Sequence, residues 1–101
     1  MTIDILYFVG CPNFQSTLQL VREVVRDLGV NAPVREIEVR TAEEAAQLGF
    51  VGSPTVRVEG EDIDPTIRGR TDSSFGCRLY DGAGVPPRSM IEHAIRGWLA
   101  S

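Results

Sequence analysis

Cys11 is the residue whose position most clearly indicates chemistry. It follows the apolar run from Ile3 to Val9 and Gly10, and an amphipathic segment that begins with Pro12 comes next. A thiol at a helix N-terminus meets unpaired backbone N–H groups and a partial positive charge, which favour the thiolate over the thiol. We therefore predict that Cys11 is a nucleophile in thiol–disulfide exchange, with oxidation to a sulfenic acid as a variant. The alternative is a small buried residue at a strand–helix junction.

Cys77 is the second cysteine, and it follows an irregular polar segment. One interpretation is a resolving thiol on a mobile loop, and the other is a buried cysteine at the edge of the fold. A disulfide with Cys11 would require the two Cα atoms to lie within about 7 Å of each other. The separation of the two cysteines in the folded chain therefore decides between these interpretations.

Metal binding is a further role for the two thiols, because paired thiolates suit soft metal ions. A closed zinc site normally needs four Cys or His ligands, and only Cys11, Cys77 and His93 are present. We therefore predict neither a zinc site nor a bound cofactor. We expect His93 to face solvent on the last helix rather than to act as a ligand or base.

The remaining charged residues resemble strand faces, caps and turns. One group in the second half of the chain could line a binding rim or simply form a solvated loop: Asp62, Asp64, Arg68, Arg70 and Asp72. The chain has no phosphate-binding loop, dinucleotide fingerprint or serine hydrolase elbow. The sequence thus offers no second reaction class to compete with thiol chemistry.

The composition limits the partners. A chain of 101 residues forms one domain, and its formal net charge of -4 argues against a general nucleic-acid binder. The longest apolar stretch, Ile5 to Val9, is far shorter than the ~20 residues that cross a bilayer. Because no secretory signal is visible, we expect a cytoplasmic protein without a membrane partner, in which both cysteines are reduced.

The first half of the chain predicts two strands and two helices. The first strand covers Ile3 to Val9, and the next helix begins at Pro12 and stops at Gly29. That helix has an apolar stripe formed by Phe14, Leu18, Val21, Val25 and Leu28. A second strand spans 36–40, where Ile37 and Val39 alternate with charged residues, and a strand–helix–strand unit implies parallel pairing.

A short helix and two strands follow. Thr41 and Glu44 have capping-box spacing, which predicts a helix over 42–48 that ends at Gly49. The third strand covers 55–59 and ends at Gly60, and residues 62–76 form a loop. We predict a short fourth strand over 78–80 and, after two prolines, a terminal helix over 90–99. The fold class is therefore α/β, with the order β-α-β-α-β-β-α, a four-stranded mixed sheet and three helices.

Three motifs in this order resemble the thioredoxin-like superfamily, in particular its glutaredoxin-sized members. They are Tyr7-Phe8-Val9-Gly10 at a strand end, Cys11-Pro12-Asn13-Phe14 before a helix, and Gly52-Ser53-Pro54-Thr55 before the third strand. The chain is also similar to short bacterial thioredoxin-like proteins that sometimes carry the name alkylmercury lyase.

This resemblance implies that Pro54 is cis and lies against Cys11, with the Ser53 backbone facing the thiol. It also assigns substrate binding to residues around that thiol: Pro12, Phe14, Ser53, Pro54 and Thr55. Phe14 stands where thioredoxins have their second cysteine, so a disulfide within the motif is excluded.

We therefore expect a thiol–disulfide oxidoreductase that uses Cys11, and in one interpretation Cys77, on a thiol or disulfide substrate that includes other proteins. The alternative is a non-catalytic module that binds a protein partner or a soft metal ion such as mercury through both thiols.

Overall fold

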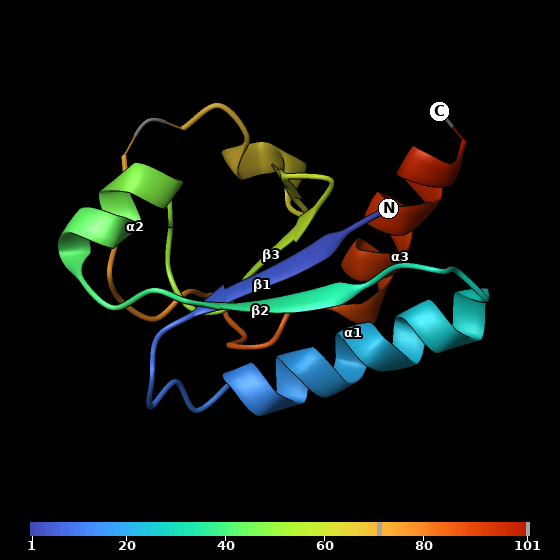
Figure 1. The fold of residues 1–101 in the computed structure, drawn as a ribbon, viewed down its shortest axis with the longest axis horizontal. Coiled ribbons are helices and arrows are strands. Elements are labelled where there is room, and N and C mark those ends of the chain that lie inside the picture. Colours follow the sequence, from blue (N-terminus) through green and yellow to red (C-terminus); the bar gives the residue numbers. More distant parts are fainter. Residues whose placement is uncertain (71, 101) are drawn as a thin grey trace.

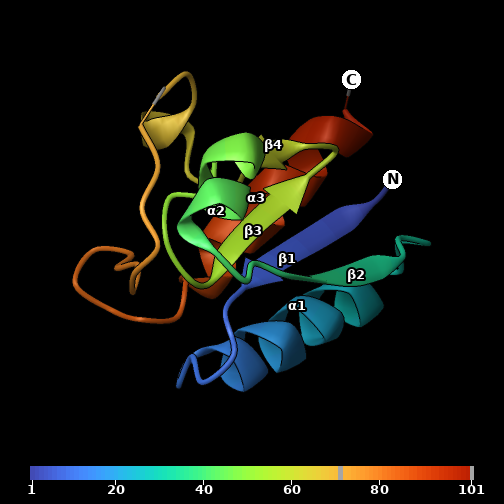
Figure 2. The same cartoon turned by 60° about the vertical axis from the view of Figure 1, so that its left-hand side comes forward.

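A four-stranded mixed sheet forms the centre of the protein (Figure 1). The structure is a computed structural model that describes residues 1–70 and 72–100. Its strands are β1 (Ile3–Tyr7), β2 (Val34–Glu38), β3 (Thr55–Val58) and β4 (Glu61–Asp62). They follow one another across the sheet in the order β2-β1-β3-β4, which Figure 2 displays clearly. The β1–β2 pair is parallel, as predicted for the strand–helix–strand unit, and β3 is antiparallel to both β1 and β4.

Helices cover the two faces of the sheet unequally. The elements are α1 (Phe14–Leu28), α2 (Ala42–Leu48), the 3-10 helix η1 (Pro65–Ile67) and α3 (Arg88–Leu99). Side chains of α1 and α3 form the main core with one sheet face, whereas α2 packs in a smaller cluster on the other face with Leu6, Val39 and Phe50. Figure 1 shows α1 and α2 on opposite sides of the strands. Among the described residues, no helix is both long and apolar enough to span a membrane.

The predicted caps of the first two helices are confirmed. Gly29 ends α1 in the left-handed region, with φ of 65°, and Gly49 ends α2 in the same way, with φ of 63°. At the start of α2, the Thr41 hydroxyl accepts a hydrogen bond from the Glu44 N–H at 3.0 Å. A hydroxyl at this position satisfies one of the N–H groups that a helix leaves unpaired, which is why the boundaries of α2 follow from local sequence.

The predicted fourth strand over 78–80 is wrong. The fourth strand is β4, which lies where the predicted loop begins and pairs with β3 in a hairpin. Glu59 and Gly60 form the two-residue connection, and both have positive φ values, 52° and 82°. Such a turn folds the chain back along the preceding strand. Around 78–80 the described chain forms isolated bridges instead, between Cys77 and Ser53 and between Tyr80 and Ala83.

The boundaries around Cys11 also differ from the prediction. The first strand ends at Tyr7 rather than Val9, and Val9 is 76% exposed. Helix α1 begins at Phe14 with Asn13 as its N-cap, so neither Pro12 nor Cys11 belongs to the helix terminus. A turn separates β1 from α1, in which the Cys11 N–H donates to the Phe8 carbonyl at 3.2 Å. Cys11 therefore lies two positions before the N-cap.

Candidate functional site

The Cys11 thiol lies in a short turn that local main-chain bonds define. Gly10 has a φ of 90°, which a residue with a side chain rarely adopts, and it redirects the chain after β1. The Phe14 N–H then donates to the Cys11 carbonyl at 3.4 Å. Cys11 is free and partly buried, and it packs against the edge of the main core. The thiol thus combines a fixed backbone with partial access to solvent.

Two aromatic rings form the inner wall of this turn. Tyr7 and Phe14 stack with ring centroids 3.8 Å apart and an angle of 12° between their planes. Phe14 is buried in the core, whereas Pro12 is exposed. Of the predicted substrate-binding residues in the motif, Pro12 is therefore open to an approaching molecule and Phe14 supports the site from inside.

The predicted cis proline is confirmed, since the Ser53–Pro54 bond is cis. The Ser53 hydroxyl accepts a hydrogen bond from the Phe8 N–H at 3.3 Å, and the Phe8 carbonyl accepts the Cys11 N–H. Phe8 thus connects the cis-proline segment to the Cys11 turn. Ser53, Pro54 and Thr55 are all buried, so the three predicted substrate-binding residues of this segment are not open to an approaching molecule.

Cys77 lies beside Ser53. The Ser53 N–H donates to the Gly76 carbonyl at 2.8 Å, and the Arg78 N–H donates to the Ser53 carbonyl at 3.0 Å. These two bonds form a parallel bridge that pairs Ser53 with Cys77. Paired residues on adjacent strands are about 5 Å apart and project to the same side. The exposed Cys77 side chain therefore projects to the side on which the Ser53 hydroxyl meets Phe8.

A buried ion pair fixes the chain directly after Cys77. The Arg78 guanidinium donates to both carboxylate oxygens of Asp62, with Nη1–Oδ2 and Nη2–Oδ1 distances of 2.6 and 2.8 Å. Arg78 is only 7% exposed and Asp62 only 8%. The guanidinium carbon also lies 4.2 Å from the centre of the Tyr80 ring, and the Tyr80 hydroxyl donates to the Pro54 carbonyl at 2.7 Å. We call Asp62, Arg78 and Tyr80 the clamp.

The segment after the clamp crosses the start of α1. Tyr80 and Ala83 exchange two main-chain hydrogen bonds, which reverse the chain at Asp81 and Gly82. Gly84 then lies so close to α1 that a Cβ atom placed on it would come within 2.9 Å of three side-chain atoms of Asn13. The Cys77 segment therefore runs from the cis proline to the residue before α1, and both cysteines lie at the same end of the sheet.

Apolar side chains surround this end of the molecule. Val9, Phe75 and Leu79 are 76%, 43% and 66% exposed. The Phe75 ring packs edge-on against Phe8, with centroids 5.6 Å apart. Between Phe75, residues 8–10 and residues 38–40 lies an open hollow of about 310 Å³. Each cysteine thus has an exposed apolar residue two positions away in sequence.

The other predicted candidates lie elsewhere. His93 is exposed on α3 and lines a hollow of about 440 Å³ with Ile63, Met90 and Arg68, and neither cysteine lines that hollow. In the predicted rim, Arg70 pairs with Asp72, and the Asp64 side chain accepts the Thr66 N–H at 3.0 Å. Over residues 1–70 and 72–100, no three His, Cys, Asp or Glu side chains come together as a metal site would require.

Sequence reasoning missed the clamp. The sequence pattern places Asp62 among the rim residues and predicts a strand at Arg78. The available signal was an arginine two positions before a tyrosine in an otherwise irregular segment, which does not identify a partner.

Comparisons with protein-family models, curated protein sequences and solved structures found no match to this chain.

Proposed function

We propose that the protein is a thioredoxin-like thiol–disulfide oxidoreductase in which Cys11 attacks and Cys77 resolves. The observation that carries the proposal is the main-chain pairing of Cys77 with Ser53, beside the Phe8 that also bonds to Cys11. The element order, the mixed sheet and the cis proline before β3 support the thioredoxin-like assignment. A second cysteine on a separate segment replaces the one that Phe14 removes from the motif.

The proposed reaction has two exchange steps. The Cys11 thiolate attacks one sulfur of a substrate disulfide, which forms a mixed disulfide and releases the other substrate sulfur as a thiolate. The Cys77 thiolate then attacks the Cys11 sulfur and releases the second substrate thiolate. The substrate disulfide gains two electrons and, after protonation, becomes two thiols, while Cys11 and Cys77 become a disulfide. A low-molecular-weight thiol or dithiol returns the protein to its reduced form by the reverse exchange.

In this proposal the cis-proline segment positions Cys77 rather than the substrate. Both main-chain hydrogen-bonding groups of Ser53 are already engaged, by Gly76 and Arg78. A substrate therefore approaches Cys11 over the exposed Pro12 and Val9. The apolar residues around the two cysteines suit a polypeptide substrate, because exposed apolar side chains recur at protein-interaction sites.

The test is oxidation of the reduced protein by a small disulfide such as hydroxyethyl disulfide, followed by intact mass spectrometry. We expect the wild type to lose its two thiol hydrogens, with peptide mapping to a Cys11–Cys77 link. The Cys77→Ser variant should accumulate the mixed disulfide on Cys11. The Cys11→Ser variant should form no internal link, because Cys77 is then the one remaining cysteine.

Two results would overturn the proposal. One is a wild type that forms stable mixed disulfides on both cysteines and no internal link. The other is stoichiometric capture of Hg²⁺ by both thiols in a protein that shows no disulfide turnover, which would support the binding module instead.

A further inference from the structure

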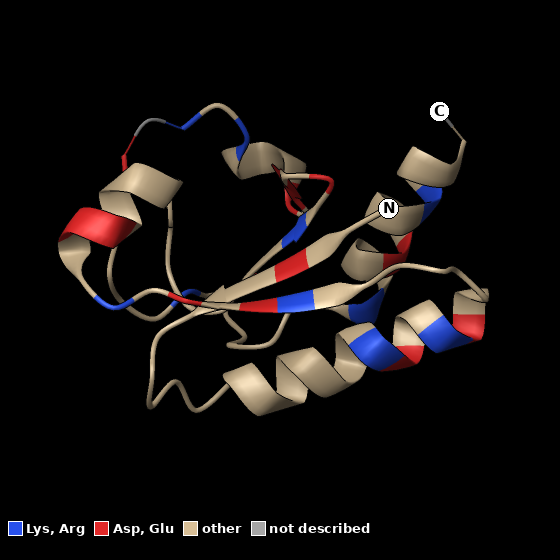
Figure 3. Cartoon of the chain, viewed as in Figure 1, with Lys and Arg blue, Asp and Glu red and all other residues tan. Residues whose placement is uncertain are grey.

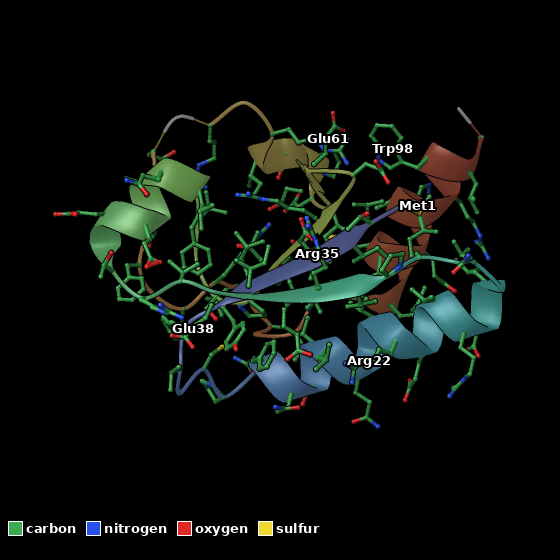
Figure 4. All side chains as sticks on the ribbon, viewed as in Figure 1. Met1, Arg22, Arg35, Glu38, Glu61 and Trp98 are labelled. Atoms are coloured by element: carbon green, nitrogen blue, oxygen red, sulfur yellow. The ribbon has the colours of Figure 1, made fainter. Side chains whose placement is uncertain are left out.

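A row of charged side chains crosses the sheet on the face that carries α2. Asp4 of β1 is in register with Arg57 of β3, and Arg57 is in register with Asp62 of β4. Arg35 of β2 extends the row, because it is in register with Asp4. Paired residues share a face, so these charges alternate in sign across the strands. Figure 4 shows the labelled Arg35 on this face, whereas Arg22 extends from α1 on the other side of β2.

Arg57 is the unmatched charge in this row. Arg35 donates to both oxygens of Asp4, at 2.7 and 3.0 Å, and Asp62 is engaged by Arg78 in the same bidentate way. Within residues 1–70 and 72–100, Arg57 forms no ion pair with a carboxylate. Its Nη2 donates to the Gly49 carbonyl at 3.0 Å, which directs the guanidinium toward the end of α2. Both neighbouring carboxylates are thus neutralised by other arginines.

The Arg57 guanidinium lines an open cavity of about 370 Å³ between the sheet, the end of α2 and the chain after η1. Arg68 and Arg70 also line it, so β3 and the chain after η1 together contribute three arginines. The Arg68 Nε donates to the Asp62 carbonyl at 2.8 Å, which fixes that side chain at the cavity wall. Figure 3 marks a basic residue on β3 and further basic residues in the chain after η1, which lies on the same side of the sheet as α2.

Three acidic groups reduce this positive charge without removing it. Asp62 lines the cavity, and its carboxylate is paired with Arg78. Glu61 lies 3.6 Å from Arg68 at the exposed rim, and Asp72 pairs with Arg70. Neither pairs with Arg57. Apolar side chains of Leu48, Val51 and Ile67 line the rest of the cavity. The cavity therefore combines a cationic floor with an aliphatic wall and has no aromatic ring for stacking.

We propose that this cavity binds a small organic dianion, a phosphate ester or a dicarboxylate. Its anionic group accepts hydrogen bonds from Arg57 and Arg68, because the planar guanidinium fork matches the oxygens of phosphate and carboxylate. Its carbon skeleton lies against Leu48, Val51 and Ile67. The site is separate from the two cysteines and does not depend on the proposed thiol chemistry.

The test is isothermal titration calorimetry of the full chain at fixed ionic strength, with glycerol 3-phosphate, succinate and neutral glycerol as probes. We expect saturable binding of at least one dianion and none of glycerol, and the comparison of the two dianions identifies the preferred class. Arg57→Gln and Arg68→Gln should each weaken binding roughly tenfold, as for the loss of a charge-assisted hydrogen bond. The matched control is Arg26→Gln on α1, because Arg26 is 75% exposed and outside the cavity.

Thermal unfolding of each variant separates loss of binding from loss of folding, and Arg57→Lys provides a second variant that keeps the charge. Arg57→Lys should bind better than Arg57→Gln and worse than the wild type. The proposal is overturned if the folded wild type binds neither dianion at millimolar concentration. Binding that Arg26→Gln weakens as much as Arg57→Gln would also overturn it, because the attraction would then be general rather than local.

Discussion

The two cysteine-bearing segments are fixed by different kinds of interaction. The Cys11 turn depends on neighbours in sequence: a glycine with positive φ and main-chain bonds to Phe8 and Phe14. The Cys77 segment depends on distant residues, because its main chain pairs with Ser53 and the following side chains bond to Asp62 and Pro54. The first segment is therefore defined locally and the second by tertiary structure.

The two cysteines should therefore respond differently to mutation in the proposed reaction. A locally defined turn keeps its shape when distant contacts change, so the intrinsic reactivity of Cys11 should tolerate mutations elsewhere. The location of Cys77 relative to Cys11 should instead depend on the clamp. Variants that break the tertiary contacts of the Cys77 segment and spare the local bonds of the Cys11 turn, or the reverse, test this difference directly.

Arg78→Leu should have the largest effect. It leaves the Asp62 carboxylate buried without its partner, which typically costs about 3–5 kcal/mol of unfolding free energy. We also expect slower closure of the Cys11–Cys77 disulfide, because the chain after Cys77 loses its anchor. The rate at which iodoacetamide alkylates Cys11 in a Cys77→Ser background should stay within about twofold of the parent. Urea unfolding and quenched alkylation measure the two effects.

Two controls accompany this variant. The double variant Arg78→Leu with Asp62→Leu removes both charges and should recover much of the lost stability. Arg22→Leu breaks an ion pair with Glu36 in which both side chains are largely exposed, and it should change stability little. If Arg78→Leu were as mild as Arg22→Leu, the clamp would not be what fixes the Cys77 segment.

Gly52→Ala should have the next largest effect. Gly52 has a φ of 125°, and a Cβ there would lie 2.8 Å from the Arg78 Cβ. Backbone strain at such a position costs about 1–3 kcal/mol, and the clash with Arg78 adds to it. Gly10→Ala is the matched control in the Cys11 turn, because its φ is 90° and a Cβ would meet no atom within 4 Å. Urea unfolding should show a larger loss of unfolding free energy for Gly52→Ala than for Gly10→Ala. The reverse order would contradict the idea that close tertiary contacts fix the Cys77 segment.

The same distinction explains what the sequence could predict of the fold. The ends of α2 follow from Thr41, Glu44 and Gly49, whose effects act within one helical turn. The position of the fourth strand could not be predicted from the sequence, because its hairpin requires Glu59 to adopt a positive φ. A glutamate rarely does so, and the sequence therefore suggested a strand end at Gly60 rather than a turn.

The candidate site also has features that short motifs predict and features that depend on tertiary contacts. Cys11 and the cis Pro54 were predicted, since each belongs to a short motif. The sequence predicts a start of α1 that is too early. The Cys11 N–H bonds to the Phe8 carbonyl in a turn, and the local pattern does not distinguish this turn from a helix start. The pairing of Asp62 with Arg78 joins two irregular segments, and no sequence period connects them. Predicting it requires knowing that the chain brings Ser53 and Cys77 together.

Tyr80→Phe should have the smallest effect. It removes the hydrogen bond to the Pro54 carbonyl and keeps the ring under Arg78, so we expect a loss of about 1 kcal/mol at pH 7. Tyr7→Phe, which keeps its stacking on Phe14, is the matched control and should cost less.

The pH dependence of the Tyr80→Phe effect sharpens this last prediction. Burial raises the pKa of the Tyr80 phenol above its ordinary value, so the folded protein favours the neutral form. Its contribution to stability is complete below the unfolded pKa of about 10, and it declines as the pH rises beyond that value toward the folded pKa. The difference in unfolding free energy between wild type and Tyr80→Phe should therefore be constant from pH 7 to 9 and narrow above pH 10. A constant difference up to pH 11 would mean that the Tyr80 hydroxyl is not buried against Pro54, and the Cys77 segment would then lack one of its tertiary anchors.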